Sequence, residues 1–552
     1  MSDHPQTLPA LLAHAVSEHA ERIAVIDGNT RLTYAELGEQ VDRAARGLIA
    51  AGVEPGDRVC IWSPNTYHWI VAALALHSAG AVLVTLNTRF TGAEAFDILE
   101  RTSTRVLFLP DRFLDNDYLA TLRGAERAVG TSDEAAGEGA AGDGRGPVPG
   151  LPALELVVRT PIEGGEEAPE PGVCSWEELL ARAPEVDDAT AAARREAVGP
   201  EDISDILFTS GTTGRPKGAM SAQRQTLAVA EAWADCAEVS ARDVYMIIAP
   251  FFHTFGYKAG WVVCLLRGAT ILPMITFDLD AVVDTIERDR VTIVPGPPTV
   301  FQTLLAYPGR ERRDLSSLRL AVTGAAVVPV TLVERMQHEL SFEMVITAYG
   351  LSEAVVVTMC RSGDDPATIA HTSGAPTGDF EVRIAGDDGA VLPAGESGEI
   401  QLRGPNVMLG YLDDPEATRN AIEPDGWFHT GDIGHLDERG YLTITDRLKD
   451  MLTVGGFNVY PAEVENAILG LDGVVECAVV GAHDERLGEV GLAYVVAKPD
   501  HSLEPEAVIA ACRERLANFK VPRRVEIVDE LPHNASGKVL KTELRARAAA
   551  AS

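Results

Sequence analysis

Residues 206–218 read Ile206-Leu-Phe-Thr-Ser-Gly-Thr-Thr-Gly-Arg-Pro-Lys-Gly218, an apolar run followed directly by glycines, hydroxyl groups and a lysine. Glycines let the backbone turn several N–H groups toward one point, and hydroxyls and an ammonium group add further donors for an anion. An apolar strand precedes the segment and a helical pattern follows it, which is where phosphate-binding loops lie in α/β proteins. The sequence therefore predicts a loop that holds a triphosphate, with donors from Thr209, Ser210, Gly211, Thr212, Thr213, Gly214 and Lys217.

This loop is not a Walker A motif. Aligned on Gly211, the pattern G-x-x-x-x-G-K-[ST] would need glycine at Pro216 and serine or threonine at Gly218. The mismatch disfavours P-loop kinases and GTPases.

A second glycine pattern, Gly137-Glu-Gly-Ala-Ala-Gly142, matches the residue types of the dinucleotide fingerprint G-x-G-x-x-G. It lacks the structural context of that fingerprint, because no apolar strand precedes it and no amphipathic helix follows it. We interpret it as a loop.

Outward from the phosphate loop, short β-branched runs alternate with helical patterns. Strands are predicted at 203–208, 244–249, 269–272, 291–294, 318–322 and 344–348, and helices at 222–236, 281–288, 299–306 and 330–340. Residues 38–110 show a similar rhythm. Alternation at this spacing predicts parallel-rich sheets packed with helices, which is an α/β fold.

The chain is expected to form two domains, because 552 residues are too many for one compact core. Beyond the polar segment Asp446-Arg-Leu-Lys-Asp450, strands at 474–480, 491–497 and 525–528 flank helices at 462–469 and 506–518. We predict a large N-terminal domain, residues 1–446, and a small mobile α+β domain, residues 447–552. A stretch rich in Gly, Ala, Glu and Pro, about residues 124–171, predicts a mobile surface insertion in the first.

Composition limits the partners. A formal net charge of −35 disfavours nucleic acid and anionic membranes, so any site for a polyphosphate must be a local exception. The longest apolar run, Trp69 to Leu76, is far too short to span a bilayer, and the first residues lack a basic leader. The seven cysteines contain no C-x-x-C pair, which disfavours a zinc site or a disulfide framework. These features predict a cytoplasmic protein without stable membrane insertion.

Further motifs follow one another in a fixed order, and together they resemble one superfamily: AMP-forming acyl-CoA synthetases, peptide-synthetase adenylation domains and luciferases. Residues 208–218 resemble its phosphate loop, and the resemblance covers about residues 10 to 545. The other motifs are Thr33-Tyr-Ala-Glu-Leu37, Thr323-Gly-Ala-Ala326, Tyr349-Gly-Leu-Ser-Glu353, Gly426-Trp-Phe-His-Thr-Gly-Asp432, Asp446-Arg-Leu-Lys-Asp450 and Asn534-Ala-Ser-Gly-Lys538.

The resemblance implies which residues bind ATP and AMP. Besides the seven loop residues named above, they are Gly324, Ala325, Tyr349, Gly350, Ser352, Asp432, Arg447 and Lys538. It also implies Mg²⁺ ligation by Glu353 and Thr212, and catalytic roles for Lys538, Thr212 and Glu353. Ser352 stands where the superfamily more often has threonine, and it keeps the hydroxyl.

Several of these residues also have a physical reading of their own. Tyr349 offers a flat face for adenine, and Asp432 offers two acceptor oxygens for ribose hydroxyls, while Arg447 adds a fork of donors. Plainer readings stay open: Tyr349 as a buried strand-end tyrosine, and Asp432 as a turn or capping residue.

The C-terminal motifs imply a two-step enzyme with a hinge. By resemblance, Lys449 is the hinge residue, and rotation there brings either Lys538 or Gly455-Gly456-Phe457 to the adenylate. The first pose makes an acyl-adenylate from an acid and ATP, and the second admits the thiol of coenzyme A. The implied activity is therefore that of an AMP-forming acid:CoA ligase, with ATP, Mg²⁺ and CoA. A stand-alone enzyme that loads a carrier protein is the alternative, although no carrier domain follows Lys538.

The acid is less well specified. The expected acid site includes His253, Gly324 and Val355, among Phe-, Val- and Pro-rich segments that suit an apolar acid; His253 could equally be a packed core histidine. Several stretches, including residues 251–260 and 404–414, resemble the actinobacterial ligases that act on an indanedione-propanoate left from steroid rings. A medium-chain or cyclic fatty acid is the alternative, and a homodimer is one option for the assembly.

Overall fold

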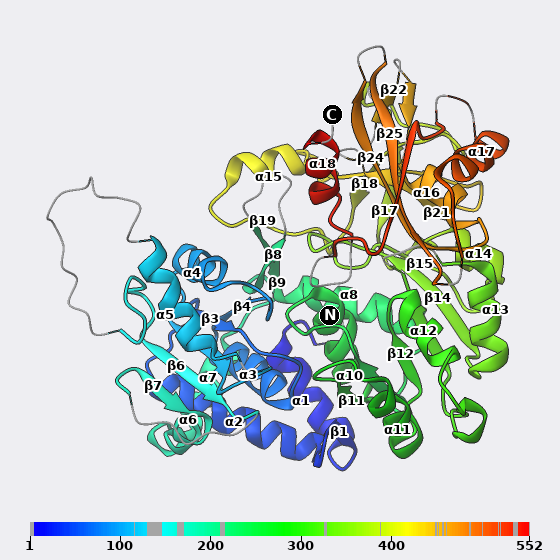
Figure 1. Cartoon of the computed structure of the whole chain (residues 1–552). Coiled ribbons are helices and arrows are strands. Elements are labelled where there is room, and N and C mark those ends of the chain that lie inside the picture. The colour runs from blue at the N-terminus through cyan, green and yellow to red at the C-terminus, as the bar shows by residue number, and fades with distance from the viewer. Residues whose placement is uncertain are drawn as a thin grey trace, which may run out of the picture.

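Three β-sheets with their helices build the larger part of the protein, and a fourth sheet builds the C-terminal part (Figure 1). The computed structural model describes residues 5–114, 116–129, 146–162, 170–209, 216–324, 328–386, 388–447, 450, 452–454, 457–459, 461–484, 487–499, 501–516, 518, 520–533 and 539–550. The four sheets lie within these residues.

The eight-stranded sheet has the order β19-β9-β8-β4-β3-β5-β6-β7. Neighbouring strands from β8 through β7 run parallel, while β9 and β19 are antiparallel additions at one edge. Its strands are β3 (Arg58–Ile61), β4 (Val82–Thr85), β5 (Val106–Pro110), β6 (Leu156–Thr160), β7 (Val173–Ser175), β8 (Ile203–Thr209), β9 (Lys217–Ala222) and β19 (Gly410–Tyr411).

This sheet corrects two predictions. The phosphate loop does not run from a strand into a helix: β8 and β9 form an antiparallel pair in which Thr209 lies opposite Lys217, and the helix starts only at Gln223. Small residues in β9 hide the alternation that would mark a strand. The expected continuous insertion at 124–171 is also wrong at residues 156–160, because β6 pairs with β5 there. Glycine- and proline-rich flanks mask this short apolar run.

The nine-stranded sheet has the order β16-β15-β14-β13-β12-β10-β11-β1-β2 and confirms the predicted alternation of strands and helices. Pairs from β14 through β1 are parallel. Its strands are β1 (Ile23–Asp27), β2 (Thr30–Thr33), β10 (Val244–Ile247), β11 (Thr270–Pro273), β12 (Ile293–Pro295), β13 (Leu320–Thr323), β14 (Met344–Tyr349), β15 (Thr358–Met359) and β16 (Ala375–Pro376). Carboxyl ends of parallel strands share one edge, so loops after β10, β12, β13 and β14 lie together.

Helix α3 (Tyr67–Ser78) lies between the two large sheets. It contacts β3 and β4 of one sheet and β1 of the other, and all its residues after Tyr67 are buried. A helix that is apolar on every side belongs in such an interior position. The other helices of this part are α1 (Leu8–His19), α2 (Tyr34–Ala50), α4 (Gly92–Arg101), α5 (Tyr118–Val129), α6 (Trp176–Ala181), the 3₁₀ helix η1 (Ala183–Glu185), α7 (Asp188–Glu196), α8 (Gln223–Cys236), α9 (Thr254–Gly256), the π-helix η2 (Tyr257–Trp261), α10 (Val262–Arg267), α11 (Leu279–Asp289), α12 (Pro298–Leu305), the 3₁₀ helix η3 (Arg310–Arg312), α13 (Val330–Glu339), α14 (Pro366–His371) and α15 (Pro415–Ala421).

The early motif Thr33–Leu37 has a structural role. Thr33 and Glu36 form a capping box at the start of α2, in which the Thr33 N–H donates to Glu36 Oε2 at 2.8 Å and the Glu36 N–H donates to Thr33 Oγ1 at 3.2 Å. Tyr34 is buried and donates to the Ala269 carbonyl at 2.7 Å. The motif therefore starts a helix and ties it to the nine-stranded sheet.

The sequence did not predict a third, antiparallel sheet with the order β17-β18-β20-β21. Its strands are β17 (Glu381–Ala385), β18 (Gly398–Arg403), β20 (Phe428–Leu436) and β21 (Leu442–Arg447). The motif ending at Asp432 lies on β20, and β21 ends at Arg447 in the predicted hinge segment.

The C-terminal part has its own apolar core, centred on β24 and β25. Its elements are β22 (Leu452–Val454), β23 (Phe457–Val459), α16 (Pro461–Leu469), β24 (Val474–Asp484), β25 (Gly488–Ala497), α17 (Pro505–Arg515), β26 (Arg524–Val528) and α18 (Lys541–Ala550). Three strands and two helices were expected; β22, β23 and α18 were not. The whole is an α/β fold, as predicted, and no helix in the described ranges is long and apolar enough to cross a bilayer.

His77 is a buried histidine on α3 held by two polar neighbours. Its Nδ1 lies 3.3 Å from Gln223 Nε2, and its Nε2 lies 3.4 Å from Tyr257 Oη. Burial, and secondly the charge of Lys258, lower the pKa of His77 from 6.5 to about 3. Between these values the unfolded chain binds a proton that the folded protein does not, so His77 contributes stability above pH 6.5 that is lost as pH falls toward 3.

Replacing His77 with Gln is expected to reduce the loss of stability on acidification. Between pH 6.5 and pH 5 the wild type is expected to lose roughly 2 kcal/mol more free energy of unfolding than the variant, because each pH unit contributes about 1.4 kcal/mol. The measurement is the urea midpoint of unfolding at several pH values for both proteins. His338→Gln, at an exposed position of α13, is the matched control and is expected to keep the wild-type slope. Equal slopes for wild type and His77→Gln would contradict the assignment.

Candidate active site

A hydrogen bond between Tyr349 and Asp432 forms the centre of the site. Tyr349 ends β14, Asp432 lies in β20, and the tyrosine hydroxyl donates to Asp432 Oδ2 at 2.5 Å. Both residues are 8% exposed. Asp432 lies opposite Arg447 in the pairing of β20 with β21. Three residues predicted from separate motifs to contact the nucleoside are thus brought together by two different sheets.

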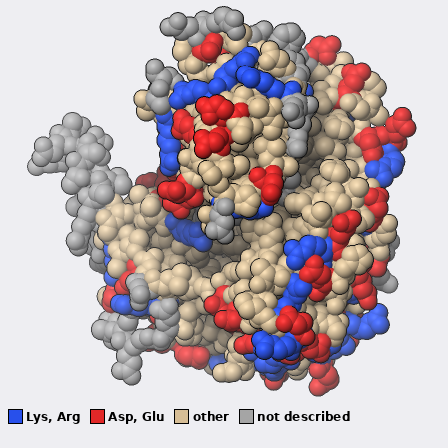
Figure 2. Space-filling view, turned by 45° about the vertical axis from the view of Figure 1, so that its right-hand side comes forward, with Lys and Arg blue, Asp and Glu red and all other residues tan. Residues whose placement is uncertain are grey.

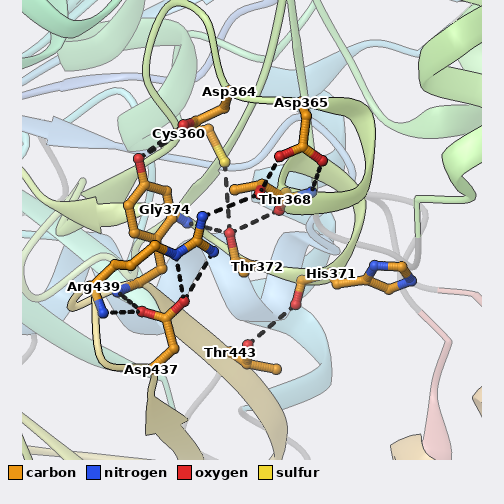
Figure 3. A network of polar contacts seen from close by, with 11 residues as sticks. Cys360, Asp364, Asp365, Thr368, His371, Thr372, Gly374, Asp437, Arg439 and Thr443 are labelled. Carbon is orange, nitrogen blue, oxygen red and sulfur yellow. Dashed lines mark hydrogen bonds and ion pairs between the residues drawn. The ribbon is translucent and has the colours of Figure 1, made fainter. Parts of the chain in front are cut away.

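A polar network holds the β20–β21 hairpin against the end of the nine-stranded sheet (Figure 3). At the hairpin turn, Asp437 accepts from the Arg439 guanidinium, and Arg439 Nη1 lies 3.4 Å from Thr368 Oγ1 in α14. On β21, Thr443 Oγ1 donates to the His371 carbonyl at 3.2 Å. Because α14 follows β15, these bonds keep the hairpin that carries Asp432 beside β14.

Glu353 is held by a tyrosine that the sequence analysis did not single out. Tyr411, on the short strand β19, donates its hydroxyl to Glu353 Oε1 at 2.9 Å. The Met408 N–H donates to the Glu353 carbonyl at 2.7 Å. Burial, and secondly the Glu353 carboxylate, raise the pKa of Tyr411, so its hydroxyl stays a donor. The pair is 58 residues apart in sequence, and no local pattern marks it.

Lys217 completes this cluster. It starts β9, and its Nζ lies 5.0 Å from the centre of the Tyr411 ring, a distance suited to a cation–π interaction. Before it, the Pro216 carbonyl accepts from Arg101 Nη1 at 2.8 Å, which ties the end of the phosphate segment to α4. A cation and a carboxylate thus share one tyrosine beside the predicted phosphate loop.

The turn after Tyr349 is tight and contains a strained residue. Val355 has φ +63°, which is rare for a β-branched side chain, and its side chain packs in the main core. A Cβ on Gly350 would lie 1.7 Å from the Val355 carbonyl oxygen, so this position requires glycine. The Val357 N–H donates to the Tyr349 carbonyl at 2.9 Å and closes the turn. Glu353 and Ser352 therefore lie on a short loop of fixed shape.

His253 lies at the surface of the protein and not in the core. Its side chain is exposed, yet surrounding protein atoms desolvate the ring and lower its pKa. Its Nδ1 accepts from the Phe255 N–H at 3.2 Å, so the neutral ring carries its proton on Nε2. The ring is thus a neutral donor at the carboxyl end of β10.

Figure 2 shows that the surface is hollowed between the part at the top and the larger part below, with basic side chains on the wall of the hollow. Elsewhere in this view acidic and basic patches are interspersed among other residues, and the whole chain has a net charge of −35. A local basic wall in an acidic protein suits an anionic ligand.

The predicted residues fall into two groups. The structure places Thr209, Lys217, Gly324, Tyr349, Gly350, Ser352, Glu353, Val355, Asp432 and His253, and it places Arg447 at the end of β21 and Phe457 at the start of β23. Outside the described residues lie Ser210, Gly211, Thr212, Thr213, Gly214, Ala325, Lys449, Gly455, Gly456 and Lys538, so their roles stay predictions.

Comparisons with known proteins give one consistent result. The family model described as AMP-binding enzyme matches residues 12–412, and that of the AMP-binding enzyme C-terminal domain matches residues 463–538. The chain is 55% identical over 545 residues, 99% of each chain, to the 3-[(3aS,4S,7aS)-7a-methyl-1,5-dioxo-octahydro-1H-inden-4-yl]propanoyl:CoA ligase of Rhodococcus jostii (strain RHA1). It is 53% identical to the ligase of that name in Mycobacterium tuberculosis (strain ATCC 25618 / H37Rv), over 98% of each chain. Among solved structures, the anthranilate CoA ligase AuaEII in complex with anthranoyl-AMP superposes with a TM-score of 0.84 at 27% identity, over 100% of this chain and 99% of that one.

Replacing Tyr411 with Phe is expected to slow acid-dependent ATP–pyrophosphate exchange by about tenfold or more, because a hydrogen bond to a charged group contributes about 1.5–3 kcal/mol. The exchange rate is measured as a function of Mg²⁺ concentration, since the change alters the support of Glu353. Tyr307→Phe is the matched control: its hydroxyl donates to Asp280 at 2.8 Å on the surface, and its exchange rate should match wild type. Wild-type exchange by Tyr411→Phe would show that Glu353 needs no such support.

Proposed function

We propose, on the premise that the chain belongs to the AMP-binding enzyme family, that the acid it activates is the indanedione-propanoate for which its two ligase relatives are named. The chain is an AMP-forming acid:CoA ligase, which uses ATP with Mg²⁺ and takes CoA as co-substrate. The observation that carries the choice of acid is the 55% identity over 99% of both chains.

The reaction has two displacement steps and needs no nucleophile from the protein. In the first, a carboxylate oxygen of the acid attacks the α-phosphorus of ATP, the bond to the β-phosphate oxygen breaks, and pyrophosphate leaves. In the second, the CoA thiol loses its proton and attacks the carbonyl carbon of the acyl-adenylate, and AMP leaves. Positioning and charge stabilisation supply most of the first step.

In this proposal Tyr349, Asp432 and Arg447 hold the nucleoside. Asp432 accepts from the ribose hydroxyls, and the hydrogen bond from Tyr349 fixes the orientation of its carboxylate. Adenine lies between the Tyr349 ring and the backbone at Gly324, where a Cβ would come within 3.3 Å of the Ala348 carbonyl oxygen. Lys217 and the loop 209–214 hold the phosphates.

Glu353 suits a magnesium ion beside those phosphates. A carboxylate is a hard oxygen ligand of the kind Mg²⁺ binds, and the bond from Tyr411 holds it beside Lys217 at the phosphate side of the site. Thr212 is the proposed second ligand. When bound, the ion neutralises charge on the phosphate oxygens.

His253 is proposed to orient the carboxylate of the acid. Its Nε2–H is a neutral donor, so it can hold the carboxylate without lowering its nucleophilicity as strongly as a cation would. Val355 forms part of the acid wall, and Lys538 neutralises the charge that gathers as carboxylate and α-phosphate approach.

The C-terminal part is proposed to rotate at Lys449 between the two steps. Strands β22 and β23 pair antiparallel with Val454 opposite Phe457, on either side of positions 455 and 456. The segment assigned to CoA binding therefore joins two paired strands, which can move as one unit with their sheet.

Two finer statements complete the proposal. The reaction takes place in the cytoplasm: none of the seven cysteines, all of them in the described ranges, forms a disulfide, in keeping with a reducing compartment that supplies ATP and CoA. The second statement is that the chain forms a homodimer, which is tested by measuring its mass in solution by light scattering.

The acid is tested with a panel assayed for AMP release in the presence of CoA. The panel contains the indanedione-propanoate, straight-chain acids of medium length and cyclic acids. The expected result is a kcat/KM for the indanedione-propanoate that exceeds the others by at least about a hundredfold, since its ring shape and two keto groups distinguish it from them. A higher value for a medium-chain or cyclic acid would overturn the choice. A thioester that forms on a carrier protein and never on CoA would overturn the acceptor.

Replacing Lys538 with Ala is expected to abolish acid-dependent pyrophosphate exchange while CoA attack on preformed acyl-adenylate continues at nearly the wild-type rate. The reason is that the lysine neutralises charge only in the first step. Lys498→Ala, which removes a partly exposed lysine paired with Asp472, is the control and should keep both rates. Undiminished exchange by Lys538→Ala would refute the assignment.

A further inference from the structure

A fully buried ion pair connects the strand before the phosphate loop to the segment that carries His253. Lys258 Nζ lies 2.8 Å from Asp205 Oδ1, and the two side chains are 1% and 0% exposed. Asp205 belongs to β8, and Lys258 belongs to the π-helix η2. With 1% exposure, the Lys258 side chain has almost no surface available to a ligand. Two charges withdrawn from water are costly compared with an apolar pair of similar volume.

The surroundings of the pair fix its geometry. Asp205 Oδ2 accepts from Ser204 Oγ at 2.6 Å and from Thr226 Oγ1 at 3.2 Å, so the carboxylate cannot turn. Its other oxygen faces the Lys258 ammonium. The neighbouring His77 stays neutral, because burial and the charge of Lys258 lower its pKa to about 3. The pair is therefore a rigid link between β8 and η2.

Two further contacts hold the same segment from the same sheet. Asn65, just after β3, accepts from the Phe251 N–H at 2.7 Å and donates to the Ala249 carbonyl at 2.9 Å. Thr85, at the end of β4, donates to the Phe252 carbonyl at 2.9 Å. The segment follows β10 of the nine-stranded sheet, yet these anchors come from the eight-stranded sheet.

We propose that Lys258 is a positioning residue for the acid: by its pair with Asp205 it fixes His253 relative to β8, the strand that leads into the predicted phosphate loop. The inference rests on the proposed function, in which His253 orients the carboxylate and the loop after β8 holds the phosphates. The placement of His253 determines whether the carboxylate oxygen reaches the α-phosphorus in line.

The two partners differ in stiffness, which gives the proposal a specific consequence. Strand β8 is paired on both sides, with β4 and with β9, so it keeps its place when the ion pair is lost. The segment 250–258 contains the three-residue helix α9 and the start of η2, and it has no strand neighbour. Loss of the pair should therefore displace His253 and leave the phosphate loop in place.

The test measures KM for the acid, KM for ATP and the melting temperature, by acid-dependent ATP–pyrophosphate exchange and thermal unfolding. For Lys258→Met we expect KM for the acid to rise by about tenfold or more while KM for ATP stays within about twofold, because displacement of one reacting group impairs its own alignment alone. Equal changes in both KM values, or no change in either, would overturn the proposal.

A double variant separates positioning from stability. In Lys258→Met with Asp205→Asn no uncompensated charge is buried, so the melting temperature should return toward wild type. The rigid link is still absent, so KM for the acid should stay high. If KM for the acid recovered together with the melting temperature, the pair would be merely structural and the proposal would fail.

The pair of Asp243 and Arg319 provides the matched control. Asp243 is buried and accepts from Arg319 Nε at 3.1 Å, but these residues precede β10 and β13 and lie at the opposite edge of the nine-stranded sheet. Asp243→Asn with Arg319→Met should lower the melting temperature without raising KM for the acid. A rise equal to that of Lys258→Met would attribute the effect to general loosening and overturn the proposal.

Thr85→Val tests the anchoring of the segment that carries His253 even if the variants of Lys258 and Asp205 do not fold. It removes one hydrogen bond to the same segment without altering size, and KM for the acid should rise about threefold. Unchanged KM would count against the anchoring of this segment. If the wild-type enzyme shows no ATP–pyrophosphate exchange with any acid of the panel, the proposed function itself fails. If the wild-type enzyme exchanges and the variants keep its KM values, only the positioning role of Lys258 fails.

Discussion

The hydrogen bond from Tyr349 to Asp432 is the contact on which the arrangement of the site depends, because it joins two sheets that share no strand. One residue ends β14, where loops of the nine-stranded sheet gather, and the other lies on the antiparallel sheet that leads into the predicted hinge. Both groups are buried, so a missing partner would leave a desolvated polar group at considerable cost. The end of β14 and the hairpin that leads into the predicted hinge segment are therefore fixed to each other at one point.

A protein with a net charge of −35 that binds ATP and CoA must hold anions by short-range contacts. The structure shows how the few cations are used. Lys217 lies on the Tyr411 ring and beside Glu353, where its charge is fixed in place. Arg101 anchors the backbone of the phosphate segment through the Pro216 carbonyl. Such an arrangement attracts a metal-complexed triphosphate more than a bare polyanion, which the acidic exterior repels.

The sequence predicted the features that local patterns carry and missed those that depend on distant partners. The six strands and four helices predicted between residues 203 and 349 followed from periodicity and are present, whereas the helices at residues 254–267 were not predicted. The order of motifs grouped Tyr349, Asp432 and Arg447, and the structure joins Tyr349 to Asp432 and pairs Asp432 with Arg447. Strand β9 was taken for the approach to a helix, because its small residues show no alternation. The bond from Tyr411 to Glu353 and the pair of Lys258 with Asp205 were missed, since the partners of each contact are far apart in sequence.

The choice of acid depends on residues outside the ATP machinery. Discrimination between acids requires a wall whose shape does not relax around a wrong acid. Two devices in this chain supply rigidity there. Val355 at φ +63° stores backbone strain that the closed turn and Gly350 maintain, and Lys258 ties the segment that carries His253 to β8. In the proposed acid site, rigidity at both places would reject an acid of the wrong shape by misplacing its carboxylate relative to the α-phosphorus, which would lower the rate even when the acid binds.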